Sequence, residues 1–231
     1  MVGLGTLINM AAIAAGGTAG LVFRRYLSKS LQTNLMSVMG LVCMFLGTAG
    51  TLSLMLRVSG TGPALTSTGA MMMVISFTVG TLIGTILKLE DRFEGFGLWL
   101  QRKAGRTGDN GFVGAFVTAS LTVCIGAMAV IGAIQDGIAG DYTVLAAKAV
   151  LDCVIILIMT SAIPVGIFQG LVTLLAFLIG PLLSQASIDA IGLTGSMMIF
   201  AVGVNLVWGK KFSVANMLPT LIFAALWPVF L

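Results

Sequence analysis

Two opposite charges lie four residues apart in an otherwise apolar segment, "AAKAVLDCVIILIM" (residues 146–159). This spacing places Lys148 and Asp152 on one face of a helix, where their side chains can pair. A charge at the centre of a bilayer costs at least about 2.5 to 3.5 kcal/mol on insertion scales, so retained charges are candidate functional groups. We expect Asp152 to bind a cation or a proton while Lys148 competes for the carboxylate. The alternative is a structural ion pair whose lysine extends toward the membrane surface.

Isolated amide side chains in other apolar segments could add oxygen ligands to such a site. An amide in a membrane more often bonds one helix to another, so each residue taken alone is a weak candidate. In "ANMLPT", Pro219 lacks an amide donor and tends to free the carbonyl of Ala215. Asn216 lies beside that carbonyl and is therefore the strongest candidate. The four amides are Asn216, Asn9, Gln169 and Asn205.

A glycine-rich stretch, "CIGAMAVIGAIQDGIAGDYT", precedes the charged segment. Its glycines either allow tight helix packing followed by a turn, or break a helix near Gly132 and expose backbone groups to a polar cavity. Asp136 and Asp141 have no basic neighbour there, so they would concentrate cations at an entrance, although solvated loop carboxylates are the ordinary alternative. The glycines are Gly126, Gly132, Gly137 and Gly140.

The composition argues against catalysis. The chain has no histidine, and Cys43, Cys124 and Cys153 lie singly in apolar segments, as buried hydrophobic residues do. We expect no metal site and no cofactor. An intramembrane aspartate protease needs two carboxylates, whereas only Asp152 lies well inside a span. No glycine-rich phosphate loop is present, so we expect neither an enzyme nor an ATP-driven pump.

The elements that position these residues are membrane helices. The chain has 231 residues, 58% hydrophobic and 9% charged, with a mean hydropathy of +1.10, whereas soluble domains carry about 25% charged residues. Apolar segments of roughly 20 residues predict an all-α transmembrane bundle in a single domain, 1–231. We predict about eight spans, at 5–23, 34–56, 69–87, 112–134, 143–163, 166–183, 194–208 and 214–231. If Pro164 is only a kink, the count falls to seven.

Charge placement favours eight spans. Ten of the twelve basic residues then lie in loops on one side, which predicts a bacterial cytoplasmic membrane with both termini on the non-cytoplasmic side. The segment "LEDRFEGFGLWLQRK" (89–103) places apolar residues at helical spacing opposite charged ones. It predicts an amphipathic helix along the cytoplasmic interface.

Weak sequence similarity between two parts of the chain is consistent with an inverted repeat of spans 1 to 3 and 6 to 8. The two units are 5–87 and 166–231, and they flank a central helix pair, 112–163. Aligning "GLVCMFLG" with "SMMIFAVG" matches Gly40 with Ser196 and Gly47 with Gly203. Three-helix units of opposite topology are common in transporters.

Several of these motifs resemble a known family. "GAIQDGIAGD", the following "KAVLD" and the late "NMLP" are similar to bacterial multi-pass membrane proteins grouped as domain of unknown function family 554. The opening "INMAAIAAGGTAG" and "GTLIG" with "LEDRFE" extend the resemblance over essentially the whole chain. It implies a bacterial cytoplasmic-membrane protein and no established activity.

These features lead us to expect an ion-coupled transporter for a small cation or cationic solute. One alternative is an oligomeric ion channel, and another is a non-transporting scaffold or sensor subunit. The expected partners are the lipid bilayer and a small ion or solute. We expect no nucleic acid partner and leave a homo-oligomer open.

Overall fold

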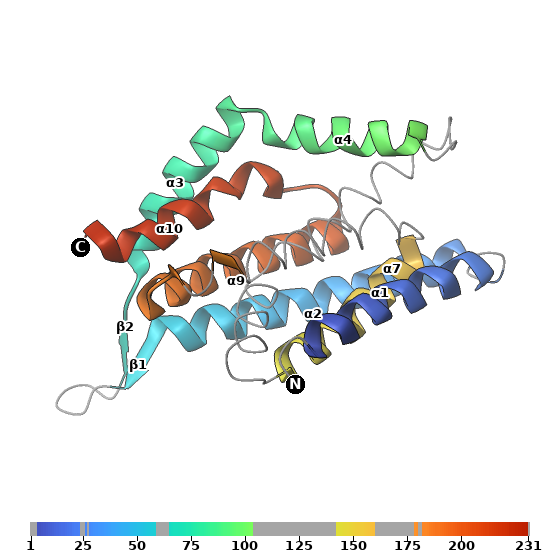
Figure 1. Ribbon diagram of the computed structural model, residues 1–231, viewed down its shortest axis with the longest axis horizontal. Coiled ribbons are helices and arrows are strands. Elements are labelled where there is room, and N and C mark those ends of the chain that lie inside the picture. The colour runs from blue at the N-terminus through green and yellow to red at the C-terminus, as the bar shows by residue number, and fades with distance from the viewer. Residues whose placement is uncertain are drawn as a thin grey trace.

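The computed structural model describes residues 4–23, 26, 28–58, 65–103, 142–159, 178–179 and 182–230. Within them the fold is helical apart from one short hairpin (Figure 1). The elements are α1 (Leu4–Phe23), α2 (Lys29–Met55), β1 (Leu56–Val58), β2 (Leu65–Ser67), α3 (Ala70–Ile86), α4 (Leu89–Lys103), α7 (Thr143–Met159), α9 (Gln185–Trp208), the 3-10 helix η2 (Val214–Met217) and α10 (Pro219–Phe230).

Local sequence signals set the ends of these helices. The hydroxyl of Ser28 accepts a hydrogen bond from the Leu31 amide at 3.2 Å, and Ser184 accepts one from Ser187 at 3.1 Å, so both serines cap a helix amino terminus. Gly69 precedes α3 in the left-handed region, with φ +82°, where a side chain would be strained. The strands pair antiparallel in the register Leu56↔Ser67.

The helices pack in pairs through glycine. A Cβ at Gly20 of α1 would lie 2.5 Å from the carbonyl oxygen of Leu157 on α7, and one at Gly47 of α2 would lie 2.6 Å from the carbonyl oxygen of Ser196 on α9. Gly80 of α3 meets Thr220 of α10 in the same manner. Such closeness allows van der Waals packing between backbones, which drives helix association in lipid.

The order of these contacts gives the helix directions. Gly16 meets Cys153 and Gly20 meets Leu157, so α1 and α7 run parallel. Along α2 and α9 the order reverses, since Gly40 meets Gly203 whereas Gly47 meets Ser196. These two helices are antiparallel and lie side by side (Figure 1).

The same reversal makes α3 and α10 antiparallel, because Gly80 meets Thr220 and Gly84 meets Asn216. One end of the bundle therefore gathers the last turn of α2, the hairpin and the first turns of α3 and α9 with the last turn of α10 (Figure 1). We call it the hairpin end. The opposite end, where α4 follows α3, is the α4 end.

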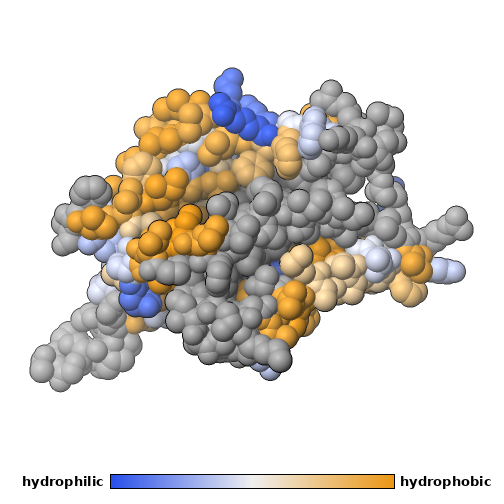
Figure 2. Space-filling model, viewed as in Figure 1, coloured by the Kyte–Doolittle hydropathy of each residue, from blue (hydrophilic) through white to orange (hydrophobic). Residues whose placement is uncertain are grey.

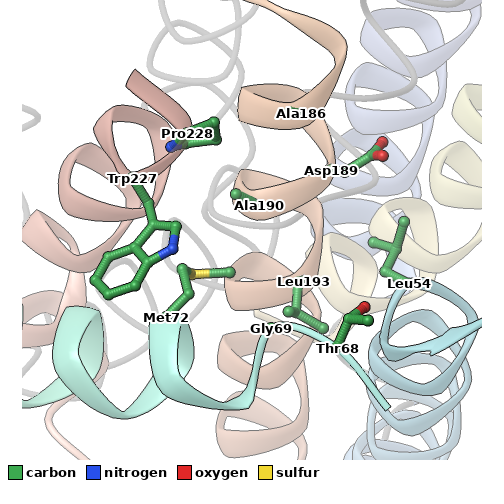
Figure 3. A pocket seen from close by; sticks show the side chains of 10 residues that line it. All are labelled: Leu54, Thr68, Gly69, Met72, Ala186, Asp189, Ala190, Leu193, Trp227 and Pro228. Atoms are coloured by element: carbon green, nitrogen blue, oxygen red, sulfur yellow. The ribbon is translucent and has the colours of Figure 1, made fainter. Parts of the chain in front are cut away.

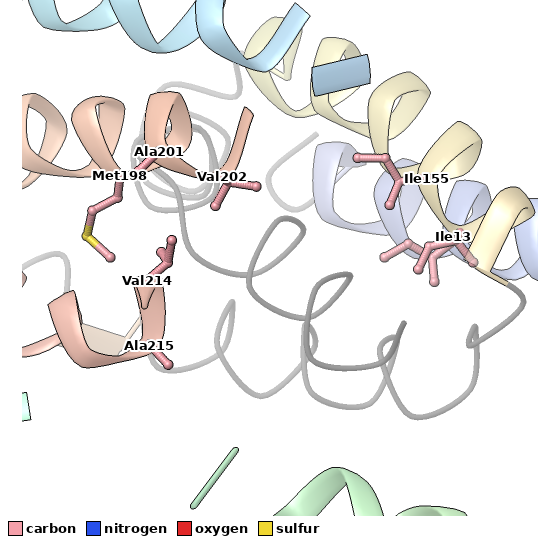
Figure 4. Packing of buried hydrophobic residues seen from close by; sticks show 8 residues of the cluster. Ile13, Ile155, Met198, Ala201, Val202, Val214 and Ala215 are labelled. Atoms are coloured by element: carbon pink, nitrogen blue, oxygen red, sulfur yellow. The ribbon is translucent and has the colours of Figure 1, made fainter. Parts of the chain in front are cut away.

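Buried apolar side chains join the pairs. Figure 4 shows Ile13 of α1 beside Ile155 of α7, while Met198 of α9 lies near Val214 and Ala215 of η2. Large apolar side chains also face outward, including Phe45 at 71% exposure and Val229 at 71%. Figure 2 shows apolar surface over α3 and α10 and hydrophilic surface at the corner between α3 and α4. Apolar patches of this kind on a helical bundle suit contact with lipid.

Two described helices, α2 and α9, are long and apolar enough to cross a membrane, and α3 with α4 adds a third if that pair, bent by 56°, counts as one span. The predicted spans at 5–23 and 69–87 agree with α1 and α3 to within one residue, and 143–163 begins where α7 begins. The predicted helix 89–103 is α4.

Four details of the prediction were wrong. The start of span two at residue 34 is five residues late, because α2 begins at Lys29. The start of span seven at residue 194 is nine residues late, because α9 begins at Gln185. Span eight opens with a 3-10 turn before α10, since Pro219 interrupts helical hydrogen bonding. The hairpin of β1 and β2 was not foreseen in an all-α fold. The predicted spans at 112–134 and 166–183 lie almost wholly outside the described residues.

Candidate functional site

The charged pair on α7 is fully enclosed. Asp152 is 1% exposed and Lys148 is 4% exposed, and the Lys148 ammonium contacts and hydrogen-bonds the Asp152 carboxylate. The helical spacing of four residues brings the two groups together, as the sequence predicted. Each charge thereby gains a counter-ion, which offsets part of the penalty for burying it.

Asn9 completes the site from α1. Its side chain is 2% exposed and lies close enough to interact with the Asp152 carboxylate, an acceptor to which only the amide nitrogen can donate. The other atom of that amide, Oδ1, is buried and has no hydrogen-bond partner in the described part of the chain. An unpaired buried acceptor costs about 1 to 3 kcal/mol, so this oxygen is available to a further donor or cation.

Glycine positions Asn9 against α7. Gly5 lies four residues before Asn9 and Gly16 seven residues after it, and both pack directly on α7, at Leu145 and Cys153 respectively. All three therefore lie on the face of α1 that touches α7. Cys43 of α2 is 1% exposed, and α2 contacts α7 as α1 does, so α1 and α2 both pack against the helix that carries the pair.

The other two described amides, Asn205 and Asn216, hydrogen-bond to backbone groups at the α4 end. Asn205 Oδ1 accepts hydrogen bonds from the amides of Lys211 at 2.8 Å and Phe212 at 2.9 Å, and its nitrogen donates to the Phe212 carbonyl. Asn216 Oδ1 accepts from the Glu90 amide at 2.9 Å. Neither amide lies with the ion pair, because both fold the connections around α9 and η2.

Pro219 is the first residue of α10 and does not free the carbonyl that was expected. The Ala215 carbonyl accepts a hydrogen bond from the Leu218 amide at 3.2 Å, which closes the 3-10 turn. The remaining candidates fall outside the described residues. They are Gln169, Asp136, Asp141, Gly126, Gly132, Gly137 and Gly140.

The sequence reasoning missed a buried carboxylate at the α4 end. Glu90 is 7% exposed, and its carboxylate accepts a hydrogen bond from the Ala215 amide at 3.1 Å and pairs with Lys210 at 3.0 Å. Lys210 also pairs with Glu94 at 3.0 Å. Partial burial by itself lowers the pKa of Lys210, but its hydrogen bonds to Glu94 and Glu90 outweigh this and raise the pKa overall.

A carboxylate at the hairpin end was missed as well. Asp189 lies inside α9 and lines a cavity of about 460 Å³ together with residues of α2, α3 and α10 (Figure 3). The late start predicted for this span left Asp189 in a loop. The capping serine in "SQASID" is the signal that would have placed it on the helix, because Ser184 is a favoured residue at a helix amino terminus.

These features define a helical membrane protein with an enclosed ion pair between its helices. The chain belongs to the family described as Protein of unknown function (DUF554), which matches residues 4–229, and the predicted resemblance is thereby confirmed. The Uncharacterized membrane protein YdfK of Bacillus subtilis (strain 168) is 26% identical over 227 residues, covering 94% of this chain and 92% of YdfK. The Uncharacterized protein YqgA of Escherichia coli (strain K12) is 26% identical over 234 residues, covering 96% of this chain and 94% of YqgA. No solved structure matches the chain.

Proposed function

We propose that this protein is an ion-coupled carrier for a small cation or cationic solute, with Asp152 as the coupling site. The observation that carries the proposal is the buried Asp152 carboxylate, which pairs with Lys148 on α7 and interacts with Asn9 on α1. Lys148 would act as an internal cation that occupies Asp152 until an external cation or proton replaces it. The free Oδ1 of Asn9 supplies a second oxygen beside that position.

Helix directions support the eight-span topology. If both termini face away from the cytoplasm, α1 and α7 run inward together, and α9, which is antiparallel to α2, also runs inward. Two helices that cross the membrane in the same direction must be separated along the chain by an odd number of other spans. One crossing between α3 and α7 and another between α7 and α9 give eight spans, and the hairpin end is then the non-cytoplasmic end.

The contact between α2 and α9 supports the inverted repeat. The sequence alignment matches Gly40 with Ser196 and Gly47 with Gly203. A two-fold rotation that exchanges α2 with α9 therefore converts the Gly40–Gly203 contact into the Gly47–Ser196 contact, and both contacts are close. Repeats of opposite topology provide a carrier with two equivalent conformations, one open to each side.

A structural role for the pair is the alternative that a specific observation favours. Neither the cavity lined by Asp189 nor a groove of about 280 Å³ on α4 includes Asp152 or Lys148 in its lining. On that alternative the ion pair and Asn9 fasten α7 to α1 in a scaffold or sensor subunit. An oligomeric channel is a further alternative, which rate and coupling measurements separate from a carrier.

The deciding experiment is reconstitution in liposomes under defined gradients of H⁺, Na⁺ and K⁺. We expect saturable, gradient-coupled cation flux in the native protein and none in Asp152→Asn, while both proteins elute identically on size exclusion. Flux that persists in Asp152→Asn would refute the assigned role of Asp152. Current that is insensitive to a second ion would favour a channel, and no flux with any gradient would favour the scaffold.

A further inference from the structure

The cavity at the hairpin end has the size of a ligand site and is lined by several helices. Its volume of about 460 Å³ lies within the range of about 300 to 1,000 Å³ that is typical of small-molecule sites. Four helices line it: α2 contributes Leu54, α3 contributes Met72, α9 contributes Asp189, and α10 contributes Trp227. Segments far apart in the sequence thus converge on one concave surface.

The charged residue and the aromatic residue of the lining lie on opposite sides of the cavity. Figure 3 shows Trp227 and Met72 together, with Asp189 and Leu54 on the opposite side of the view. Asp189 is the one charged side chain among the described lining residues. Because this side chain is negatively charged, the cavity favours a cationic ligand over an anionic one.

Asp189 is poised to accept a cation. Its Oδ1 accepts a hydrogen bond from the Gln185 side chain at 2.9 Å, one helical turn earlier, which orients the carboxylate. In the described part of the chain no lysine or arginine forms an ion pair with it. A half-buried carboxylate that no described lysine or arginine pairs with gains from an incoming ammonium group, as the buried carboxylates of Asp152 and Glu90 gain from Lys148 and Lys210.

We propose that this cavity binds an organic amine cation, with its ammonium group on Asp189 and its apolar body against Trp227 and Met72. An inorganic ion would leave the indole and thioether surfaces without a partner, whereas an amine with an apolar skeleton fills both sides. As a statement of the carrier's cargo, the inference rests on the proposed function. As a binding site it stands on the cavity alone.

The site is separate from the Asp152 pair. Leu54 lines the cavity and Cys43 lies by the pair, and these two residues are about three turns apart on α2, or about 16 Å at 1.5 Å per residue. On the proposed topology an amine enters from the non-cytoplasmic side at Asp189. The coupling ion is held deeper, at Asp152.

Trp227 allows a direct test, because the chain has only two other tryptophans, Trp99 and Trp208. In full-length protein carrying Trp99→Phe and Trp208→Phe, in lipid nanodiscs, the indole of Trp227 reports on the cavity. We expect 2-phenylethylammonium to change its fluorescence saturably. Asp189→Asn should weaken that response at least tenfold. Asp189→Glu should retain it, and Asp91→Asn, which removes an exposed charge on α4, should leave it unchanged.

The neutral isostere 2-phenylethanol separates amine recognition from apolar partition. Equal responses to the alcohol and the ammonium, or an unchanged response in Asp189→Asn, would overturn the inference. Asp152→Asn should still bind the ammonium. Asp189-dependent binding without any flux would therefore refute the carrier and keep the site, whereas amine flux without Asp189-dependent binding would refute the site and keep the carrier.

Discussion

Asn9 on α1 interacts with the buried carboxylate of Asp152 on α7, although the two residues lie in distant parts of the chain. The contact links the first helix to the charged helix and leaves Asn9 Oδ1 without a partner in the described residues. It makes Asn9, rather than Asn216, the amide of the candidate site. Asn216 binds the Glu90 backbone at the α4 end.

The ion pair can be tested by removing one partner or both. We expect Lys148→Ala to destabilise the protein by about 3 to 5 kcal/mol, because it leaves Asp152 buried without a counter-charge. The double variant Lys148→Met with Asp152→Leu should unfold at nearly the same denaturant concentration as the native protein. It should lack flux. Unfolding in detergent and flux in liposomes are the two readouts. A double variant that transports normally would contradict the proposed site, and one as unstable as Lys148→Ala would indicate that the pair is mainly structural.

The free oxygen of Asn9 predicts a separable effect. Asn9→Leu removes both the donor to Asp152 and the spare acceptor, so we expect the apparent affinity for the coupling ion to fall about tenfold or more. Asn9→Asp keeps the oxygen and replaces the NH2 donor with a second, charged oxygen, so the pH dependence of flux should differ from that of the native protein. Flux measured against ion concentration at several pH values gives the apparent affinity and its pH dependence. The hypothesis fails if Asn9→Leu lowers the maximal rate alone and leaves the ion affinity unchanged.

Glycine contacts predict a position-dependent effect on stability. Gly20→Ala would place a Cβ 2.5 Å from the Leu157 carbonyl oxygen, and we expect a loss of about 1 to 3 kcal/mol as α1 and α7 separate. Gly95→Ala is the matched control on α4, because nothing lies within 4 Å of its Cβ position. It should be neutral or gain up to about 1 kcal/mol from helix propensity. Equal losses in the two variants would contradict the packing described.

The ion pairs of Lys210 predict a pH-dependent contribution at the α4 end. Because the folded-state pKa of Lys210 is raised, its stabilising contribution is complete below its unfolded value of about 10.5 and disappears as pH rises through the folded value. Lys210 is 57% exposed, so we expect Lys210→Gln to cost only about 0.2 to 1 kcal/mol at pH 8. The difference from the native protein should vanish well above pH 10.5.

Lys211→Gln is the adjacent control, since its contact with Asn205 is made by the backbone amide. Unfolding free energies of the three proteins between pH 8 and pH 12 measure the effect. A Lys210 contribution that grows with pH would show that the stabilisation has another origin. An equal effect of Lys211→Gln would point to net charge rather than to the contacts with Glu90 and Glu94.

Helical spacing and hydropathy carry local information, and these parts of the structure were predictable. The positions of α1, α3 and α4, the start of α7 and the pairing of Lys148 with Asp152 all follow from residues close together in sequence. The start of α9 was missed because hydropathy falls in its first turns, where Ser187 and Asp189 lie, although the Ser184 cap extends the helix there.

The sequence by itself determined that this chain is a membrane protein of its family, with helices near these positions and a charged pair on one face of α7. Only the tertiary structure decided which amide joins that pair, which amides fold the loops, and that Asp189 and Trp227 share a cavity. The physical reason is that every apolar helix is equally compatible with lipid. The choice of neighbour depends on backbone approach at a few glycines and on which polar groups meet between them.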